Sequence, residues 1–164
     1  YESFVFIPQV ASEERWVTAP WDTKEYELAP ISSSMRMTFQ ALDRFIKKNR
    51  SIDRNRIYVM GLSMGGWGTW DAISRRPEFF AAAVPICGSG DPVQASKLTN
   101  LPIWAWHGER DEVISVTGSK KMVRAIDDAG GKIRYTEIKG RGHDSWLDVW
   151  NSQELWKWLY EQRR

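Results

Sequence analysis

The chain has 164 residues, the size of one folded domain, and 42% of them are hydrophobic, which excludes a disordered chain. Its 23 basic and 21 acidic residues nearly balance, which argues against a nucleic-acid-binding surface. A single cysteine, Cys87, excludes an intramolecular disulfide and a zinc site built from thiolates, and it is expected in the core. No apolar run approaches the roughly 20 residues of a membrane span.

The first predicted element is a buried strand at 3–8, where the apolar run SFVFIP ends at Pro8. Residues 9–31 show no periodicity and predict a long loop of the kind that often carries function. Apolar residues at helical spacing behind a run of serines then predict a helix over 32–50.

Strands and helices alternate along the rest of the chain. Strands are predicted at 56–60, 80–87, 101–108 and 132–138. Helices are predicted at 64–76, at 115–131 with Ser115 as its cap and Gly130 and Gly131 as its stop, and at the C-terminal end, where Asn151 and Glu154 have capping-box spacing. This alternation predicts an α/β fold, a mainly parallel sheet with helices on both faces.

The stretch GLSMGGWG at 61–68 raises the first question about function, because Ser63 lies between Gly61 and Gly65. The G-x-S-x-G pattern follows a predicted strand and opens a predicted helix, which is the setting of a nucleophile elbow. We expect side chains at 61 and 65 to collide with the neighbouring strand and helix. The Met64 N–H, in the first helical turn, is the predicted oxyanion donor. The alternative is a glycine-rich turn without catalytic function.

A serine nucleophile needs a general base, and the chain holds two histidines. His143 lies in GRGHDSW, between the last predicted strand and the last helix, where a flexible loop lets the imidazole reach back over the sheet edge. It is the predicted base. His107 ends a predicted buried strand and is expected to be structural, held by the turn after it.

The base needs a carboxylate that orients it, and Asp111 is the predicted partner because it follows the strand that ends at His107. Three other aspartates lie on predicted helices and are expected to be solvated: Asp71, Asp127 and Asp128. Asp144 adjoins His143 but is expected to point elsewhere.

Three segments, YVMGLSMGGWGTW, PIWAWHGERDEVI and GRGHDSW, carry Ser63, Asp111 and His143 in the order of the α/β-hydrolase superfamily. Together they resemble serine esterases related to prolyl oligopeptidases and to the phospholipase/carboxylesterase group. FVFIPQV resembles an upstream strand of that group. The resemblance implies hydrolysis of carboxylic esters without a cofactor or a metal. Related domains sometimes follow an immunoglobulin-like domain in secreted enzymes, so it also favours a secreted or periplasmic location.

The prediction is a serine carboxylesterase that acts on small or short-chain acyl esters through a Ser-His-Asp triad. Substrate contacts are predicted from four residues: Gln9, Trp16, Trp67 and Trp146. A peptidase or thioesterase with the same triad, and a non-catalytic binding domain of the same fold, are the alternatives.

The resemblance also implies strands upstream of FVFIP, one of which lies between it and RIYVM. Residues 1–164 are therefore expected to form one catalytic domain that is the C-terminal portion of a longer α/β-hydrolase domain. An N-terminal segment would then complete the sheet and supply the second oxyanion donor. The alternative is that FVFIP pairs directly with RIYVM.

Overall fold

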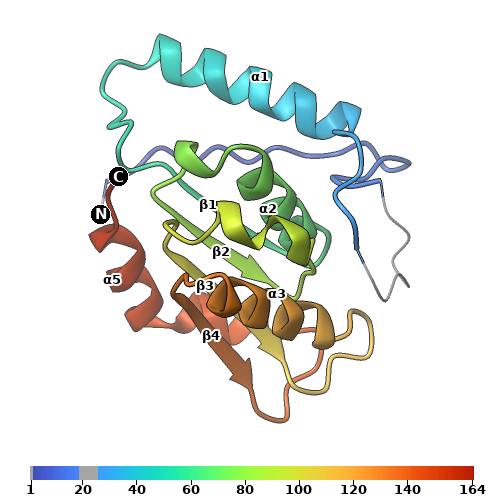
Figure 1. Cartoon of the computed structure of the whole chain (residues 1–164). Helices are drawn as coiled ribbons and strands as arrows, with labels where there is room; N and C mark the ends of the chain where they lie inside the picture. The colour runs from blue at the N-terminus through green and yellow to red at the C-terminus, as the bar shows by residue number, and fades with distance from the viewer. Residues whose placement is uncertain (1, 19–25) are drawn as a thin grey trace.

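The computed structural model describes residues 2–18 and 26–164, which form a parallel sheet flanked by helices (Figure 1). The strands lie side by side in chain order: β1 (Tyr58–Leu62), β2 (Ala82–Ile86), β3 (Ile103–Gly108) and β4 (Ile133–Ile138). The helices are α1 (Ser33–Lys48), α2 (Met64–Arg75), α3 (Thr117–Asp128), α4 (Trp146–Asn151) and α5 (Gln153–Glu161), with short 3₁₀ segments η1 (Pro77–Phe79) and η2 (Pro92–Lys97). The predicted α/β fold is confirmed. Within the described residues, no helix has the length and apolar character to cross a membrane.

Alternate residues of the central strands face two different cores, as the period of a β-strand requires. On β3, Ile103 and Ala105 face a core that includes residues of α1, α2 and α3. Trp104 and Trp106 point to the opposite face, where they pack with residues of α4 and α5. Every residue of β2 and β3 is buried, so the middle of the sheet is a rigid base for the loops that follow these strands.

Helix α1 begins as its serine-rich start predicts. The Ser32 hydroxyl accepts a hydrogen bond from the Met35 N–H at 3.0 Å, which satisfies one of the free donors of the first turn. Lys47 and Lys48 in the last turn place positive charge at the negative end of the helix dipole.

The prediction of a buried strand at 3–8 is wrong. This segment has no strand partner, and the exposed fractions of Phe4, Val5 and Ile7 are 56%, 75% and 78%. The Phe4 ring instead packs on Phe45 of α1, with centroids 5.9 Å apart. An apolar segment becomes a β-strand only where another strand is available to pair with it, and the composition of the segment does not guarantee one. Among the described residues, β1 pairs only with β2. Direct pairing of FVFIP with β1 is therefore not observed, and the N-terminal completion of the sheet stays a prediction.

Two predicted helix caps are also corrected. The C-terminal helix is two helices, because the chain is extended at Ser152, and the Ser152 hydroxyl rather than Asn151 caps α5 by accepting the Leu155 N–H at 3.2 Å. Ser115 lies one residue before the N-cap position of α3, and its hydroxyl accepts the Thr117 N–H at 3.3 Å. In each case a neighbouring residue takes the boundary position, the usual range of error for helix ends.

Candidate active site

Ser63 occupies a strained turn between β1 and α2. Its backbone has φ 54° and ψ −119°, a conformation that residues with a side chain rarely adopt. The Ser63 N–H donates to the Ile86 carbonyl of β2 at 2.9 Å, and the Ser63 carbonyl accepts the N–H of Gly66 at 2.8 Å. The surrounding backbone thus holds the strain in place, as is common where a reactive group is presented.

The glycines around Ser63 have different functions. A Cβ atom on Gly61 would lie 2.3 Å from the Gly65 carbonyl oxygen, so the predicted crowding at residue 61 is confirmed. A Cβ on Gly65 would meet nothing within 4 Å, so the predicted collision at residue 65 is wrong. The crowded glycine of the helix is Gly66, whose Cβ would lie 2.3 Å from the Ile86 carbonyl oxygen. The reason is the direction of the helix: its second glycine, not its first, faces β2.

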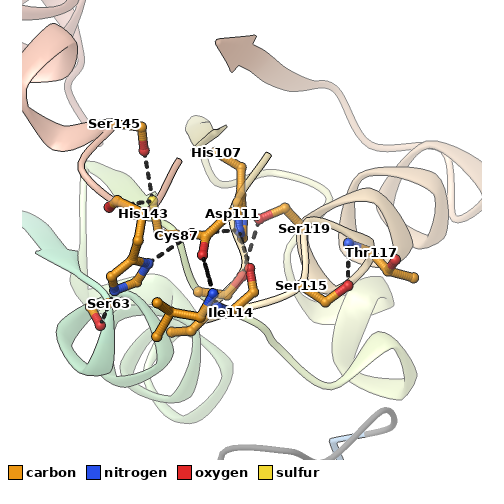
Figure 2. A network of polar contacts seen from close by, with 12 residues as sticks. Ser63, Cys87, His107, Asp111, Ile114, Ser115, Thr117, Ser119, His143 and Ser145 are labelled. Carbon is orange, nitrogen blue, oxygen red and sulfur yellow. Dashed lines mark hydrogen bonds and ion pairs between the residues drawn. The ribbon is translucent and has the colours of Figure 1, made fainter. Parts of the chain in front are cut away.

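The structure brings Ser63, His143 and Asp111 together from three separate loops (Figure 2). His143 lies between β4 and α4, and its Nε2 is 2.8 Å from the Ser63 Oγ. Its Nδ1 is 2.8 Å from the Asp111 Oδ2. The His143 side chain is 19% exposed, so this hydrogen-bonded chain lies at the surface and is open on one side.

Asp111 is held rigidly in the loop that follows β3. Its Oδ1 accepts the N–H groups of Val113 at 2.9 Å and Ile114 at 2.8 Å. Its Oδ2 lies 2.8 Å from the His143 Nδ1 and 3.4 Å from the His107 Nε2. Burial raises the pKa of this carboxyl, but the hydrogen bonds from His143 and from the two backbone N–H groups outweigh burial and hold the pKa below its usual value. Asp111 is therefore a fixed negative charge at neutral pH.

His107 is a buried residue near the end of β3, just before the loop that carries Asp111, and it does not contact Ser63. Its side chain is fully buried, with Nδ1 2.7 Å from the Ser119 hydroxyl and Nε2 2.9 Å from the Ile114 carbonyl. A carbonyl can only accept, so Nε2 carries a proton. Burial lowers the pKa of His107, which favours the neutral form. The prediction that the turn after His107 holds it is confirmed.

The other predicted aspartates differ in their surroundings. Asp127 and Asp128 are exposed, as expected. Asp144 is also exposed and lies 3.8 Å from Arg141. Asp71 is 2% exposed, so its predicted solvation is wrong. It pairs with Arg75 at 2.7 Å and accepts a hydrogen bond from the Tyr26 hydroxyl at 3.2 Å, which compensates its burial.

The residues predicted to bind substrate lie at different depths. Trp146 is the first residue of α4, and its ring meets the imidazole of His143 edge-on, with centroids 5.3 Å apart. Trp16 is half-buried and lies over Gly68, where a Cβ would be 2.9 Å from the indole. Trp67 is only 2% exposed and packs edge-on against Tyr26, which leaves little indole surface for a ligand. Gln9 is exposed in the N-terminal segment. Their contacts with substrate stay predictions.

Met64 is the first residue of α2 and follows Ser63 directly. Its N–H belongs to the group of first-turn donors that a helix cannot satisfy internally. This N–H therefore remains the predicted oxyanion donor.

Cys87 lies next to the histidine of this site, a position that sequence analysis did not predict. The expectation of a buried core position is confirmed, since the side chain is fully buried, but the backbone has φ 47° and the sulfur lies 2.7 Å from the Ser145 hydroxyl. No sequence pattern marks either property. Cys87, Asp111 and His143 also offer potential metal ligands within 4.8 Å of one another. Here the latter two already bond each other, and burial raises the pKa of the thiol to about 11, so the donors do not favour a metal.

A neutral imidazole that bridges a serine hydroxyl and a buried carboxylate can accept the hydroxyl proton and then carry a stabilised positive charge. The arrangement lies at the carboxyl ends of parallel strands, where open α/β sheets bind ligands. Fold and site together define an α/β-hydrolase.

Comparison with known proteins agrees. The model of the dienelactone hydrolase family matches residues 10–144, and the chain belongs to this family of hydrolases. The predicted resemblance to the α/β-hydrolase superfamily is thereby confirmed.

Among solved structures, a thermostable esterase is 38% identical with a TM-score of 0.84, over 92% of this chain and 41% of that protein. The bifunctional acetylxylan esterase/xylanase XynS20E of Neocallimastix patriciarum is 28% identical over 71% of this chain. An uncharacterised secreted protein of Arthroderma benhamiae is 26% identical over 78% of this chain. The chain spans 22% and 17% of these last two proteins, respectively.

Proposed function

We propose that the chain is the catalytic part of a serine carboxylesterase that hydrolyses small or short-chain acyl esters. The observation that carries the proposal is the continuous hydrogen-bonded chain from the Ser63 Oγ through His143 to Asp111, with 2.8 Å at each step. Two similar proteins support the ester as substrate class: the thermostable esterase and the acetylxylan esterase/xylanase. The latter also favours acetyl as an acyl group of suitable size.

In the first half of the reaction, the Ser63 Oγ attacks the ester carbonyl and His143 takes the hydroxyl proton at Nε2. Asp111 accepts a hydrogen bond from the Nδ1–H group, keeps the imidazole in the required tautomer and stabilises the imidazolium. The Met64 N–H donates to the oxyanion of the tetrahedral intermediate. His143 then protonates the leaving alcohol, and an acyl-enzyme remains on Ser63.

In the second half, His143 removes a proton from a water molecule, which attacks the acyl carbonyl. The imidazolium then protonates the Ser63 Oγ as the bond to the acyl group breaks, which releases the acid and restores the Ser63 hydroxyl. The Trp146 ring packs against the imidazole at nearly a right angle, with centroids 5.3 Å apart.

Labelling of the protein with a serine-directed fluorophosphonate, together with a panel of p-nitrophenyl esters, tests the proposal. We expect one label per chain, located on Ser63, and hydrolysis of p-nitrophenyl acetate and butyrate in preference to longer esters. The Ser63→Ala variant should not be labelled, and the variant of an exposed serine, Ser115→Ala, should be labelled normally.

Different results contradict different parts of the proposal. Labelling with faster hydrolysis of a p-nitroanilide or an acyl thioester would keep the nucleophile but replace the esterase by a peptidase or thioesterase. A chain that is neither labelled nor hydrolytic would be a binding domain of the same fold.

A further inference from the structure

Cys87 and Ser63 share an unusual backbone conformation at the same edge of the sheet. Among the described residues they are the two non-glycine residues with positive φ, 47° and 54°. Each directly follows a strand, and the last residues of these strands, Leu62 and Ile86, are register partners in the parallel pair β1–β2. The fold thus maintains strain at Cys87 next to the proposed nucleophile, and such strain is typical of functional positions.

The contacts of Cys87 lead to the histidine loop rather than to the serine. Its N–H donates to the Trp106 carbonyl at 2.9 Å, which fixes the residue to β3. Its sulfur lies 2.7 Å from the Ser145 hydroxyl and 3.8 Å from the His143 carbonyl oxygen (Figure 2). Both partners belong to the short segment between β4 and α4 that carries the imidazole.

The hydrogen-bonding capacity of the thiol fits these two partners. Burial raises the pKa of Cys87 to about 11, so the side chain is a neutral thiol with one proton. The His143 carbonyl can only accept, and its contact with the sulfur directs the thiol proton to it, so that the Ser145 hydroxyl donates to the sulfur. The Asp111 carboxylate is a second acceptor near the same thiol. Ser145 is itself fully buried, so water does not offer this hydroxyl an alternative partner.

We propose that Cys87 and Ser145 are positioning residues that fix the backbone of His143, so that its imidazole spans both the Ser63 hydroxyl and the Asp111 carboxylate. The inference rests on the proposed function, because positioning matters only if His143 transfers protons. Each imidazole contact is 2.8 Å, and the backbone of His143 sets both distances together. A shift of this backbone would lengthen at least one of them, and a displacement of about 1 Å can cost on the order of 100-fold in rate.

Removal of the sulfur tests the proposal. Cys87→Ala keeps the Cβ and hence the backbone strain, but it deletes the contacts of the thiol with His143 and Ser145, as well as its interactions with the Gly108 backbone and the Asp111 carboxylate. We expect kcat for p-nitrophenyl acetate to fall on the order of tenfold with little change in KM, because the ester would still bind. Cys87→Ser restores a donor with a shorter reach and should recover part of the loss. Ser145→Ala removes only the hydroxyl contact of the sulfur and should lower kcat less than Cys87→Ala. The double variant should be no worse than Cys87→Ala, because the Ser145 hydroxyl acts through the sulfur.

A control variant separates positioning from packing. Val84→Ala opens a cavity in the same strand, away from the histidine loop, and should lose stability without a change in kcat. The proton between His143 and Asp111 offers a second readout by NMR, and we expect its signal to shift or broaden in Cys87→Ala and Ser145→Ala but not in Val84→Ala. Should Cys87→Ala fail to fold, Ser145→Ala carries the test alone.

Folded Cys87 and Ser145 variants with wild-type kcat and an unchanged NMR signal would overturn the positioning role. Wild-type protein without ester hydrolysis would instead contradict the proposed function, and the NMR signal would then still decide whether the thiol orients the imidazole.

Discussion

Gly66 lies so close to the Ile86 carbonyl that a Cβ atom on residue 66 would come within 2.3 Å of that oxygen. The same carbonyl accepts the Ser63 N–H at 2.9 Å. The close approach of α2 to β2 therefore also holds the strained serine. The absence of a side chain at 66 is thus tied to the presentation of the proposed nucleophile.

The first prediction compares the two adjacent glycines. Gly66→Ala must separate α2 from β2 and should lower the free energy of unfolding by about 1–3 kcal/mol. It should also lower esterase activity, because the Ser63 turn is displaced. Gly65→Ala has open space at its Cβ and should lose no stability, and it can gain up to about 1 kcal/mol from the higher helix propensity of alanine.

Urea unfolding of both variants is the measurement. Equal stability of the two variants would show that the gap between α2 and β2 adjusts freely and that Gly66 is not needed for close packing.

The second prediction concerns the proposed triad. Ser63→Ala and His143→Ala should each reduce kcat on the order of 10⁴–10⁶-fold and leave the fold intact, because the two groups act as one unit. The double variant should be little worse than either single one. A Ser63→Ala protein that keeps a substantial part of the wild-type rate, measured with p-nitrophenyl acetate, would eliminate Ser63 as the nucleophile.

Much of the site was predictable because its chemistry needs rare residues in fixed places. The chain has two histidines, and a nucleophile elbow requires a strand before the serine and a helix after it, so the number of possible arrangements was small. Ser63 and His143 are 80 residues apart in the chain, yet their side chains are in contact. This contact is expected because the carboxyl ends of parallel strands lie at the same edge of the sheet.

Other features depend on tertiary contacts that no local pattern reveals. Pairing of a segment such as 3–8 depends on a partner strand, and its apolar composition does not supply one. The burial of Asp71 could not be predicted from its place on a helix. It depends on a segment 45 residues earlier in the chain, whose Tyr26 hydroxyl contacts the carboxylate. The positive φ of Cys87, directly after β2, is not marked by any pattern in the residues around it.

The third prediction concerns this buried aspartate. Arg75 donates to Asp71 through Nε at 2.7 Å and to the Ala29 carbonyl through Nη2 at 2.6 Å, so it connects α2 with the segment before α1. Arg75→Ala would leave the Asp71 carboxylate buried without its ionic partner and should cost about 3–5 kcal/mol of unfolding free energy. Tyr26→Phe removes a neutral donor to the charged carboxylate and should cost less, about 1.5–3 kcal/mol.

The double variant Arg75→Ala/Asp71→Ala should be more stable than Arg75→Ala alone, since it removes the unpaired charge. Thermal or urea unfolding measures this order. If Arg75→Ala were as stable as Tyr26→Phe, the ion pair would not compensate the burial of Asp71.

The last prediction concerns His107 and the dependence of stability on pH. Burial holds the pKa of His107 below its ordinary value, while Asp111 and Glu137 nearby act in the opposite direction and His143 in the same direction. Below about pH 6.5 the unfolded chain therefore binds a proton at this residue that the folded chain resists. The unfolded state holds more protons in this window, so the free energy of unfolding should fall as the pH decreases from 6.5, by at most about 1.4 kcal/mol per pH unit for one group. Asp111 further lowers the free energy of unfolding at more acidic pH, because its pKa is also held below the usual carboxyl value.

In His107→Gln the decrease in unfolding free energy between pH 6.5 and 5 should be smaller than in the wild type. The variant should nevertheless be less stable at pH 8, because its contacts with Ser119 and Ile114 are weakened. Urea unfolding of both proteins across this pH range measures the difference, and parallel curves would show that His107 takes up its proton as readily in the folded chain as in the unfolded one.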